Sequence, residues 1–401
     1  MLAYSMWGVL ALCGLFVGCE GEPPPVVVPE VQPEPREPIV GPRAISTRAA
    51  FDLVDTPEGA LLAWGAPQRM GGGLLLLRMS PMGLALSRER NILAPGDPSA
   101  PRAVEEFPGD VVEVALSTST DRYAAAWVAR DSNRVTVHST VGSLEDFRGA
   151  RHRDHGAIAM RAVGTRGFLA LGVSRAGDFS LIHRGREVEC ADCPAAGDVA
   201  IEVKPVRLGV QEDQGLRDGV VLSVPSPCTR TLFGLVSVRD DWYYAVCGRG
   251  EVSGQSTAFA LRFDPEYAHS ETLFEGCSPV GISQAMGGVM SVAQCGEALH
   301  AVWLGDAGRS MRRFESVERS VRCIDGLPAL ELVSEGKPTL QVLLEQRRAG
   351  LAPLLPPEIA GPGARAIWTG EALLVGKPLA GEVSVQRYQC EYGELTRTNP
   401  L

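Results

Sequence analysis

The chain has 401 residues, of which 45% are hydrophobic and 21% are charged. These fractions exclude an intrinsically disordered chain, and the lack of long apolar runs excludes a polytopic membrane protein. The net charge of −10 argues against a partner bound by phosphate neutralisation, so no nucleic-acid partner is expected. The 45 Gly and 29 Pro predict a chain that is rich in turns.

The N-terminal segment has the pattern of an export signal. Residues 7–18 are uncharged and mostly apolar, a run shorter than the roughly 20 residues of a transmembrane helix. The run ends at Leu15-Phe16-Val17-Gly18-Cys19, which resembles the lipobox of bacterial lipoproteins. The resemblance implies that the signal peptide, residues 1–18, is removed and that Cys19 becomes the lipidated N-terminus. A plain secretory signal and a retained membrane anchor are the alternatives.

A proline-rich segment follows the lipobox. Residues 20–43 contain eight Pro and five Glu, a composition that excludes a helix or a central strand. With Cys19 it forms an expected tether, 19–43, which reaches about 70 Å if it adopts the extended polyproline conformation. In lipoproteins, an Asp after the lipidated Cys favours the inner membrane. The residue here is Glu20, so the outer membrane is expected, with the side of the membrane left open.

The remainder, residues 44–401, is predicted to be an all-β repeat domain. A β-like run, a polar turn, a run of small and apolar residues, a second turn and an alternating run recur about seven times. Outside the signal, no stretch keeps a helical period over three turns, so almost no helix is expected. The copies are 49–83, 111–141, 157–185, 231–264, 288–316, 328–355 and 364–391.

Repeated hairpin triplets favour a β-propeller of about seven blades. Residues 186–230 fit no copy and are interpreted as an irregular insertion or a degenerate blade, so six or eight blades are also compatible with the sequence. Uneven spacing of the copies keeps tandem β-sandwiches as the alternative. The pattern resembles the propellers of bacterial secreted proteins and lipoproteins, without the signature of any one subfamily.

Eight cysteines follow the tether, and an even number outside the cytoplasm argues for disulfides. Hairpin spacing pairs Cys228 with Cys247 and Cys277 with Cys295, because each pair flanks a predicted turn. The eight are Cys190, Cys193, Cys228, Cys247, Cys277, Cys295, Cys323 and Cys390.

The other four cysteines give two further pairs. Cys190 and Cys193 would close a small loop, which leaves Cys323 to join Cys390 between the last two blades. Half of a zinc site and a redox motif are the alternatives for the Cys190-x-x-Cys193 spacing.

Sequence patterns of the common catalytic and cofactor sites are missing. The chain has no nucleophile elbow, phosphate-binding loop, His-Glu-x-x-His or dinucleotide fingerprint. We therefore assign no catalytic residue, no metal ligand and no cofactor. One histidine cluster stands out, His152-Arg153-Asp154-His155. It is interpreted as a solvated polar loop, with a metal site of two imidazoles and a carboxylate as the alternative.

These features predict a membrane-anchored lipoprotein of the cell envelope. Its propeller is expected to bind an envelope protein or a glycan without catalysis, and its lipid is expected to hold it on the membrane. A cell-surface enzyme that acts on glycans is one alternative. An envelope-assembly factor is another, although the Ala-x-Asp-Gly-x-x-Tyr-Ala-Leu motif of that family's blades is missing.

Overall fold

The chain divides into two units, Met1–Ile39 and Val40–Leu401, and every residue that the computed structural model describes belongs to the second. The expected signal peptide (1–18) and tether (19–43), with Cys19, lie outside the described residues. The described residues are 50–65, 73–87, 90–92, 110–131, 134–145, 147, 151–157, 169–173, 177–188, 200–208, 222–224, 231–239, 242–250, 256–263, 268–285, 288–304, 311–315, 317–343, 352, 354–361, 363–379 and 382–398.

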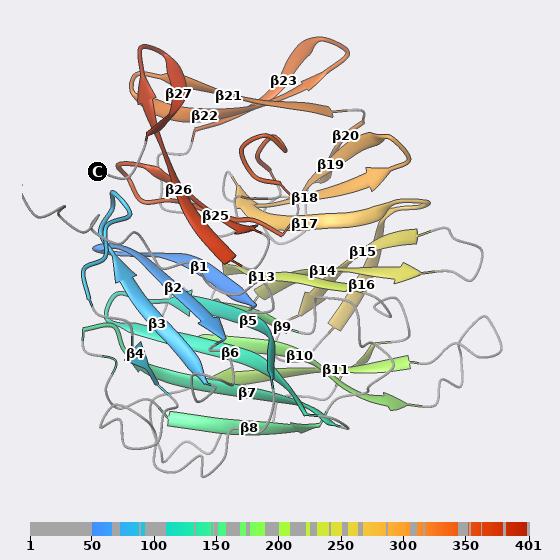
Figure 1. Ribbon diagram of the computed structural model, residues 1–401. Helices are drawn as coiled ribbons and strands as arrows, with labels where there is room; N and C mark the ends of the chain where they lie inside the picture. Colours follow the sequence, from blue (N-terminus) through green and yellow to red (C-terminus); the bar gives the residue numbers. More distant parts are fainter. Residues whose placement is uncertain are drawn as a thin grey trace, which may run out of the picture. The chain divides into compact units, whose positions relative to one another are not determined.

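The described residues form strands and turns but no helix, which confirms the all-β prediction. The same residues therefore contain no helix that could cross a membrane. The strands group into seven antiparallel sheets, each a meander in chain order, which we call blades 1 to 7 (Figure 1).

The first three blades hold twelve of the strands. Blade 1 comprises β1 (Phe51–Thr56), β2 (Gly59–Gly65), β3 (Leu74–Met79) and β4 (Arg90–Asn91). Blade 2 comprises β5 (Asp110–Thr118), β6 (Arg122–Asp131), β7 (Arg134–Ser143) and β8 (Arg151–Ala157). Blade 3 comprises β9 (Leu169–Val173), β10 (Phe179–Val188), β11 (Ala200–Leu208) and β12 (Leu222–Val224).

The remaining strands form blades 4 to 7. Blade 4 comprises β13 (Thr231–Arg239), β14 (Trp242–Gly250), β15 (Ser256–Phe263) and β16 (Ala268–Phe274). Blade 5 comprises β17 (Ser278–Ala285), β18 (Gly288–Cys295), β19 (Ala298–Leu304) and β20 (Met311–Phe314). Blade 6 has three described strands, β21 (Val317–Ile324), β22 (Leu327–Ser334) and β23 (Lys337–Leu343). Blade 7 comprises β24 (Arg365–Trp368), β25 (Leu373–Leu379), β26 (Glu382–Glu391) and β27 (Glu394–Thr398).

The blades contact one another in chain order and then close on themselves. Each first strand lies against the first strand of the next blade from β1 through β5, β9 and β13 to β17. Blades 5 and 6 meet through β19 and β21, and blades 6 and 7 meet through β21 and β27. β24 of blade 7 then returns to β1 of blade 1. This cyclic order of seven blades is a β-propeller, so the tandem β-sandwich alternative is wrong.

The limits of several blades differ from the sequence prediction. The described part of 186–230 is neither an insertion nor a separate blade, because residues 186–188, 200–208 and 222–224 form the end of β10 and the outer strands β11 and β12 of blade 3. The predicted copy 157–185 began too early, since Ala157 ends β8 of blade 2. The predicted copies 288–316 and 328–355 instead began too late, because they start at β18 and β22, the second strands of blades 5 and 6. Small apolar runs occur in first, second and third strands, so their composition does not mark the strand order.

The hydrophobic core lies between blades, because both faces of an inner strand are covered. All seven residues of β2 are buried. The consecutive residues from Tyr123 to Val128 of β6 are buried as well. One cluster joins blades 1 and 2 through Leu61 and Trp127, and another joins blades 2 and 3 through Val137 and Phe179. A strand buried on both faces reads as a continuous apolar run, which explains the Ala- and Leu-rich middle runs of the sequence.

A mostly buried carboxylate, with 15% of its side chain exposed, joins the two ends of the blade order. The Asp52 Oδ1 atom of β1 accepts hydrogen bonds from Arg365 Nε at 3.0 Å and from the Leu53 backbone N–H at 3.0 Å. Its Oδ2 atom accepts a bond from the Leu116 N–H of blade 2 at 2.7 Å. Asp52 thereby links blades 1, 2 and 7. Burial raises the pKa of Asp52, although the Arg365 charge and the two backbone N–H groups act to lower it.

Close packing reinforces this closure. The Phe51 ring lies over Gly376 of β25, where an added Cβ would be 2.8 Å from Phe51 Cε2. The Thr369 hydroxyl donates to the Pro81 carbonyl oxygen at 2.8 Å, again between blades 7 and 1. Ile367 and Leu374 of blade 7 belong to the same buried cluster as the core residues of blade 1. The Phe51 ring therefore leaves no room for a side chain larger than that of glycine at position 376.

Removing the Arg365 charge should destabilise the protein most at neutral and higher pH. Arg365→Met leaves the mostly buried Asp52 carboxylate without its countercharge and raises the Asp52 pKa further. A raised pKa means that the folded state binds the proton more tightly, so stability falls as the pH rises above about 4. We expect a loss of about 2–4 kcal/mol at pH 7, limited by the partial exposure of Arg365, and a smaller loss near pH 4.

Denaturant unfolding at pH 4, 5.5 and 7 measures this difference. Glu58→Gln is the matched control, because it removes the exposed Arg78–Glu58 pair within blade 1 and should cost less than about 1 kcal/mol. Equal losses for the two variants at pH 7 would contradict a closing role for Arg365.

Gly376→Ala tests the contact between blades 1 and 7 by packing alone. The new methyl group would collide with the Phe51 ring, so we expect a loss of about 1–3 kcal/mol in a thermal or denaturant melt. Gly361→Ala is the control, because its Cβ would meet only the Pro357 carbonyl oxygen at 3.6 Å. Phe51→Leu in the Gly376→Ala background should recover part of the loss; no recovery would argue against this contact as the cause.

Candidate functional site

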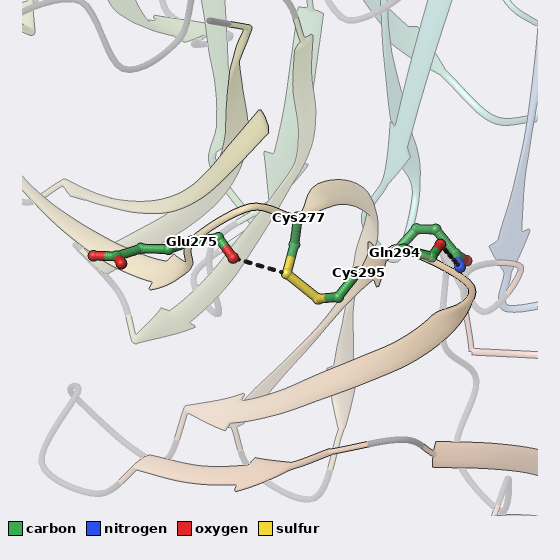
Figure 2. Close-up of a disulfide and its surroundings, with 5 residues drawn as sticks. Glu275, Cys277, Gln294 and Cys295 are labelled. Atoms are coloured by element: carbon green, nitrogen blue, oxygen red, sulfur yellow. Dashed lines mark hydrogen bonds between the residues drawn. A yellow bond between two sulfur atoms is a disulfide. The ribbon is translucent and has the colours of Figure 1, made fainter. Parts of the chain in front are cut away.

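A disulfide joins Cys277 to Cys295 in blade 5, the pairing that hairpin spacing predicts. Ser278 and Gln294 are register partners of β17 and β18, so the preceding and following residues, Cys277 and Cys295, meet at the end of the hairpin. The Cα atoms of the two cysteines are 4.3 Å apart. The Cys277 Sγ atom lies 3.2 Å from the Glu275 carbonyl oxygen, a contact drawn as a dashed line in Figure 2. The disulfide covalently links the two ends of the β17–β18 hairpin, the first hairpin of blade 5.

A second disulfide, Cys323–Cys390, joins β21 of blade 6 to β26 of blade 7, as expected for the last two blades. The Cys323 N–H also donates to the Gly393 carbonyl oxygen at 3.1 Å, across the same boundary. The turn that contains Gly393 is thus held by a covalent bond and a backbone bond. Its neighbour Tyr392 adopts φ 53° and is fully exposed.

The other two predicted pairs lie outside the described residues. Cys190, Cys193 and Cys228 are not among the described positions, and Cys247 lies on β14 without a described side chain. The pairing of Cys228 with Cys247 and the loop closed by Cys190 and Cys193 therefore stay predictions.

The histidine cluster found in the sequence is a strand and not a solvated loop. Residues 151–157 form β8, the outer strand of blade 2, and are paired with β7. The fold brings His152 and His155 of β8 together with His138 of β7 and His183 of β10. His138 is 8% exposed and His183 is 2% exposed. Charged neighbours in the sequence suggested solvent exposure, whereas His152 and His155 are half-buried by strand pairing and by their histidine partners.

Two of these histidines form a stacked pair beside Trp127. His138 Nδ1 and His152 Nε2 are 3.1 Å apart and share a hydrogen bond. The other ring nitrogen of His138, Nε2, lies 2.8 Å from the Thr136 hydroxyl. Both rings stack on Trp127 of β6, with ring centroids 5.5 Å apart in each case. Neutral His138 satisfies both contacts, because it donates through one nitrogen and accepts at the other.

The other two histidines meet between blades 2 and 3. The ring centroids of His155 and His183 are 5.4 Å apart. His155 Nε2 also lies 2.7 Å from the Ser139 hydroxyl of β7. A bulge between Val137 and His138 shifts the pairing with β8 at this point. The hairpin of β7 and β8 thus takes part in two histidine pairs, one of which reaches the next blade.

Burial lowers the pKa of three of these imidazoles, which favours their neutral form. Burial lowers the pKa of His138 to about 4. His152 and Arg134 also act to lower this pKa, whereas the negative charge of Asp154 acts to raise it. Burial lowers the pKa of His155 to about 3, with further lowering by His183, Arg153 and His138. Burial likewise lowers the pKa of His152.

The histidines of the cluster meet in pairs, and each contact that joins them holds two imidazoles. Within the described residues, no group of three or more His, Cys, Asp or Glu side chains could hold a metal ion. Sequence reasoning missed His138 and His183, which lie far from the His152–His155 motif along the chain. Their meeting depends on the pairing of β7 with β8 and of blade 2 with blade 3.

Comparisons with known proteins leave the family open. No family model matches the sequence, and no curated protein matches it. The β-propeller domain of the Trilobed protease from Pyrococcus furiosus is 12% identical with a TM-score of 0.41, over 87% of this chain and 97% of that chain. A polysaccharide lyase is 8% identical with a TM-score of 0.41, over 74% and 77%.

A longer enzyme is also among the solved structures that match this chain. Prolyl oligopeptidase B from Galerina marginata is 12% identical with a TM-score of 0.42, over 88% of this chain. The match covers 51% of the peptidase, so the chain spans about half of its length. At such low identities and TM-scores these similarities carry no conclusion about activity or ligand.

Cys277→Ser should expose one specific thiol. With its partner removed, Cys295 becomes free and reacts with an alkylating reagent in unreduced, denatured protein, and peptide mapping identifies the labelled residue. The loss of a bond that spans 18 residues should also cost about 2–4 kcal/mol of stability. The control is the double variant Cys277→Ser/Cys295→Ser, which should show no new label. A label on a different cysteine would contradict the Cys277–Cys295 pairing.

Proposed function

We propose that this chain is a lipid-anchored propeller of the cell envelope that acts as a binding module. The observation that carries the proposal is the pair of disulfides, Cys277–Cys295 and Cys323–Cys390, in one domain. Structural disulfides of this kind form in oxidising compartments outside the cytoplasm. That setting agrees with a signal that ends at Gly18-Cys19 and a proline-rich tether after it. Lipid on Cys19 would hold the propeller at the outer membrane.

The use of the buried polar groups supports binding over catalysis. Asp52, a carboxyl group with a raised pKa, accepts hydrogen bonds from Arg365 and two backbone N–H groups, which ties three blades together. This is a structural use of a perturbed group, and it makes the blades a rigid support for their connecting turns. Pre-organised turns reduce the ordering cost of binding.

Tyr392 is the described side chain best placed to meet a partner. It is fully exposed in the turn between β26 and β27, next to the Cys323–Cys390 disulfide. Tyrosine is enriched among the side chains that dominate protein interfaces, because its rigid ring covers a large area at low entropic cost. We propose an envelope protein as the partner, with a glycan as the alternative ligand.

The anchor and the binding role can be tested in producing cells. Wild-type protein should incorporate a labelled fatty acid and fractionate with outer membranes, whereas Cys19→Ser should remain unlabelled and soluble. Cross-linking in intact cells followed by purification should recover one partner in a fixed ratio. Tyr392→Ala should lower its recovery at least about tenfold, whereas Glu394→Gln, at the first residue of β27 after the same turn, should leave it unchanged.

Two results would contradict this proposal. Equal membrane association and labelling of wild type and Cys19→Ser would exclude the lipid anchor. Recovery of no partner, together with release of sugars from envelope glycans by the purified protein, would favour the glycan-acting enzyme.

A further inference from the structure

The two histidine pairs of the β7–β8 hairpin lie in different surroundings. The His138–His152 pair stacks on Trp127, which packs in the cluster between blades 1 and 2. The His155–His183 pair instead spans blades 2 and 3. A change in imidazole charge therefore acts both on the attachment of β8 to its own blade and on its contact with the next blade.

We propose that these histidines form an acid-sensitive latch that holds the outer strand β8 against blades 2 and 3 while they are neutral and releases it when they are protonated. The inference is independent of the proposed binding role and of the lipid anchor. It rests on the placement of four imidazoles in two contacting pairs.

Protonation removes the first contact by hydrogen-bond chemistry. His138 Nδ1 and His152 Nε2 share one hydrogen bond at 3.1 Å, which needs one donor and one acceptor. When both rings are protonated, both nitrogens carry a hydrogen and neither can accept. The bond is then replaced by repulsion between two like charges beside the buried Trp127.

Protonation opposes the second contact by charge. Two imidazolium rings would stand 5.4 Å apart between blades 2 and 3. Arg153 of β8 adds a further positive charge near His155, and Arg134 of β7 adds one near His138. Asp154 of β8 opposes both effects, but its side chain is exposed to solvent. On the blade 3 side, the backbone of Lys204 in β11 pairs with that of His183.

The way in which the stability of the closed state changes with pH follows from the pKa values of His138 and His155 in that state. An open strand restores an ordinary histidine pKa of about 6.5, whereas the closed state holds His138 at about 4 and His155 at about 3. Between these limits the open state binds more protons, so the closed state loses stability as the pH falls below about 6.5. Each such histidine raises the opening constant by about tenfold per pH unit within that window.

Hydrogen exchange of the full-length protein measures this opening. Protection factors, corrected for the intrinsic pH dependence of exchange, are followed for β8 and for β2 between pH 7.5 and 4.5. We expect protection in β8 to fall at least about 100-fold between pH 7 and pH 5, while β2 keeps its protection. Constant protection in β8 down to pH 4.5 would overturn the proposal.

Variants separate the latch from general acid sensitivity. His138→Gln and His155→Gln should each reduce the pH slope of β8 exchange, and the double variant should nearly remove it. His300→Gln is the matched control, because His300 lies on β19 against Phe274, outside the cluster. A double variant with the wild-type pH slope would overturn the latch.

Ring NMR of the wild-type protein adds a measurement that needs no substitution. In the closed state, the rings of His138 and His155 should stay neutral at pH 5.5. The latch would be excluded if both rings became protonated with midpoints near 6.5 while β8 stayed protected.

Discussion

The structure depends on one contact, the closure of blade 7 onto blade 1 around the Asp52 carboxylate. A blade whose inner strands are apolar on both faces, such as blade 1, relies on its two neighbours to cover those faces. Asp52 accepts hydrogen bonds from its own blade, from Leu116 of blade 2 and from Arg365 of blade 7. Loss of this junction would expose the apolar faces of blades 1 and 7, where Phe51 meets Gly376.

The boundaries between blades are stabilised by different chemistry. Blades 7 and 1 meet through an ion pair and close packing, whereas blades 6 and 7 share the Cys323–Cys390 disulfide. Blades 2 and 3 meet through a shared apolar cluster and the His155–His183 contact. An imidazole that becomes exposed when β8 opens takes up a proton below about pH 6.5, which neither a disulfide nor an Arg–Asp pair does. Acid is therefore expected to act first on the boundary of blades 2 and 3, while the closure persists.

The sequence predicted the features that depend on local spacing. The hairpin count led to seven blades, and the turn between Cys277 and Cys295 led to their disulfide, since register partners in a hairpin are close in the chain. The order of strands in blade 3 was predicted wrongly. The apolar run at Leu169 is the first strand of that blade, although it has the composition that was expected of a second strand. The His152–His155 motif was wrongly interpreted as a solvated loop, because its pairing with β7 through a bulge is not revealed by single-sequence patterns.

A double-mutant cycle on Asp52 and Arg365 tests the closure most directly. Unfolding free energies are measured at pH 7 for wild type, Asp52→Asn, Arg365→Met and the double variant. If the pair closes the propeller, the two losses overlap, and the double variant is less destabilised than their sum by at least about 1.5 kcal/mol. Additive losses, within about 0.5 kcal/mol, would show that the two side chains act independently and would contradict the account.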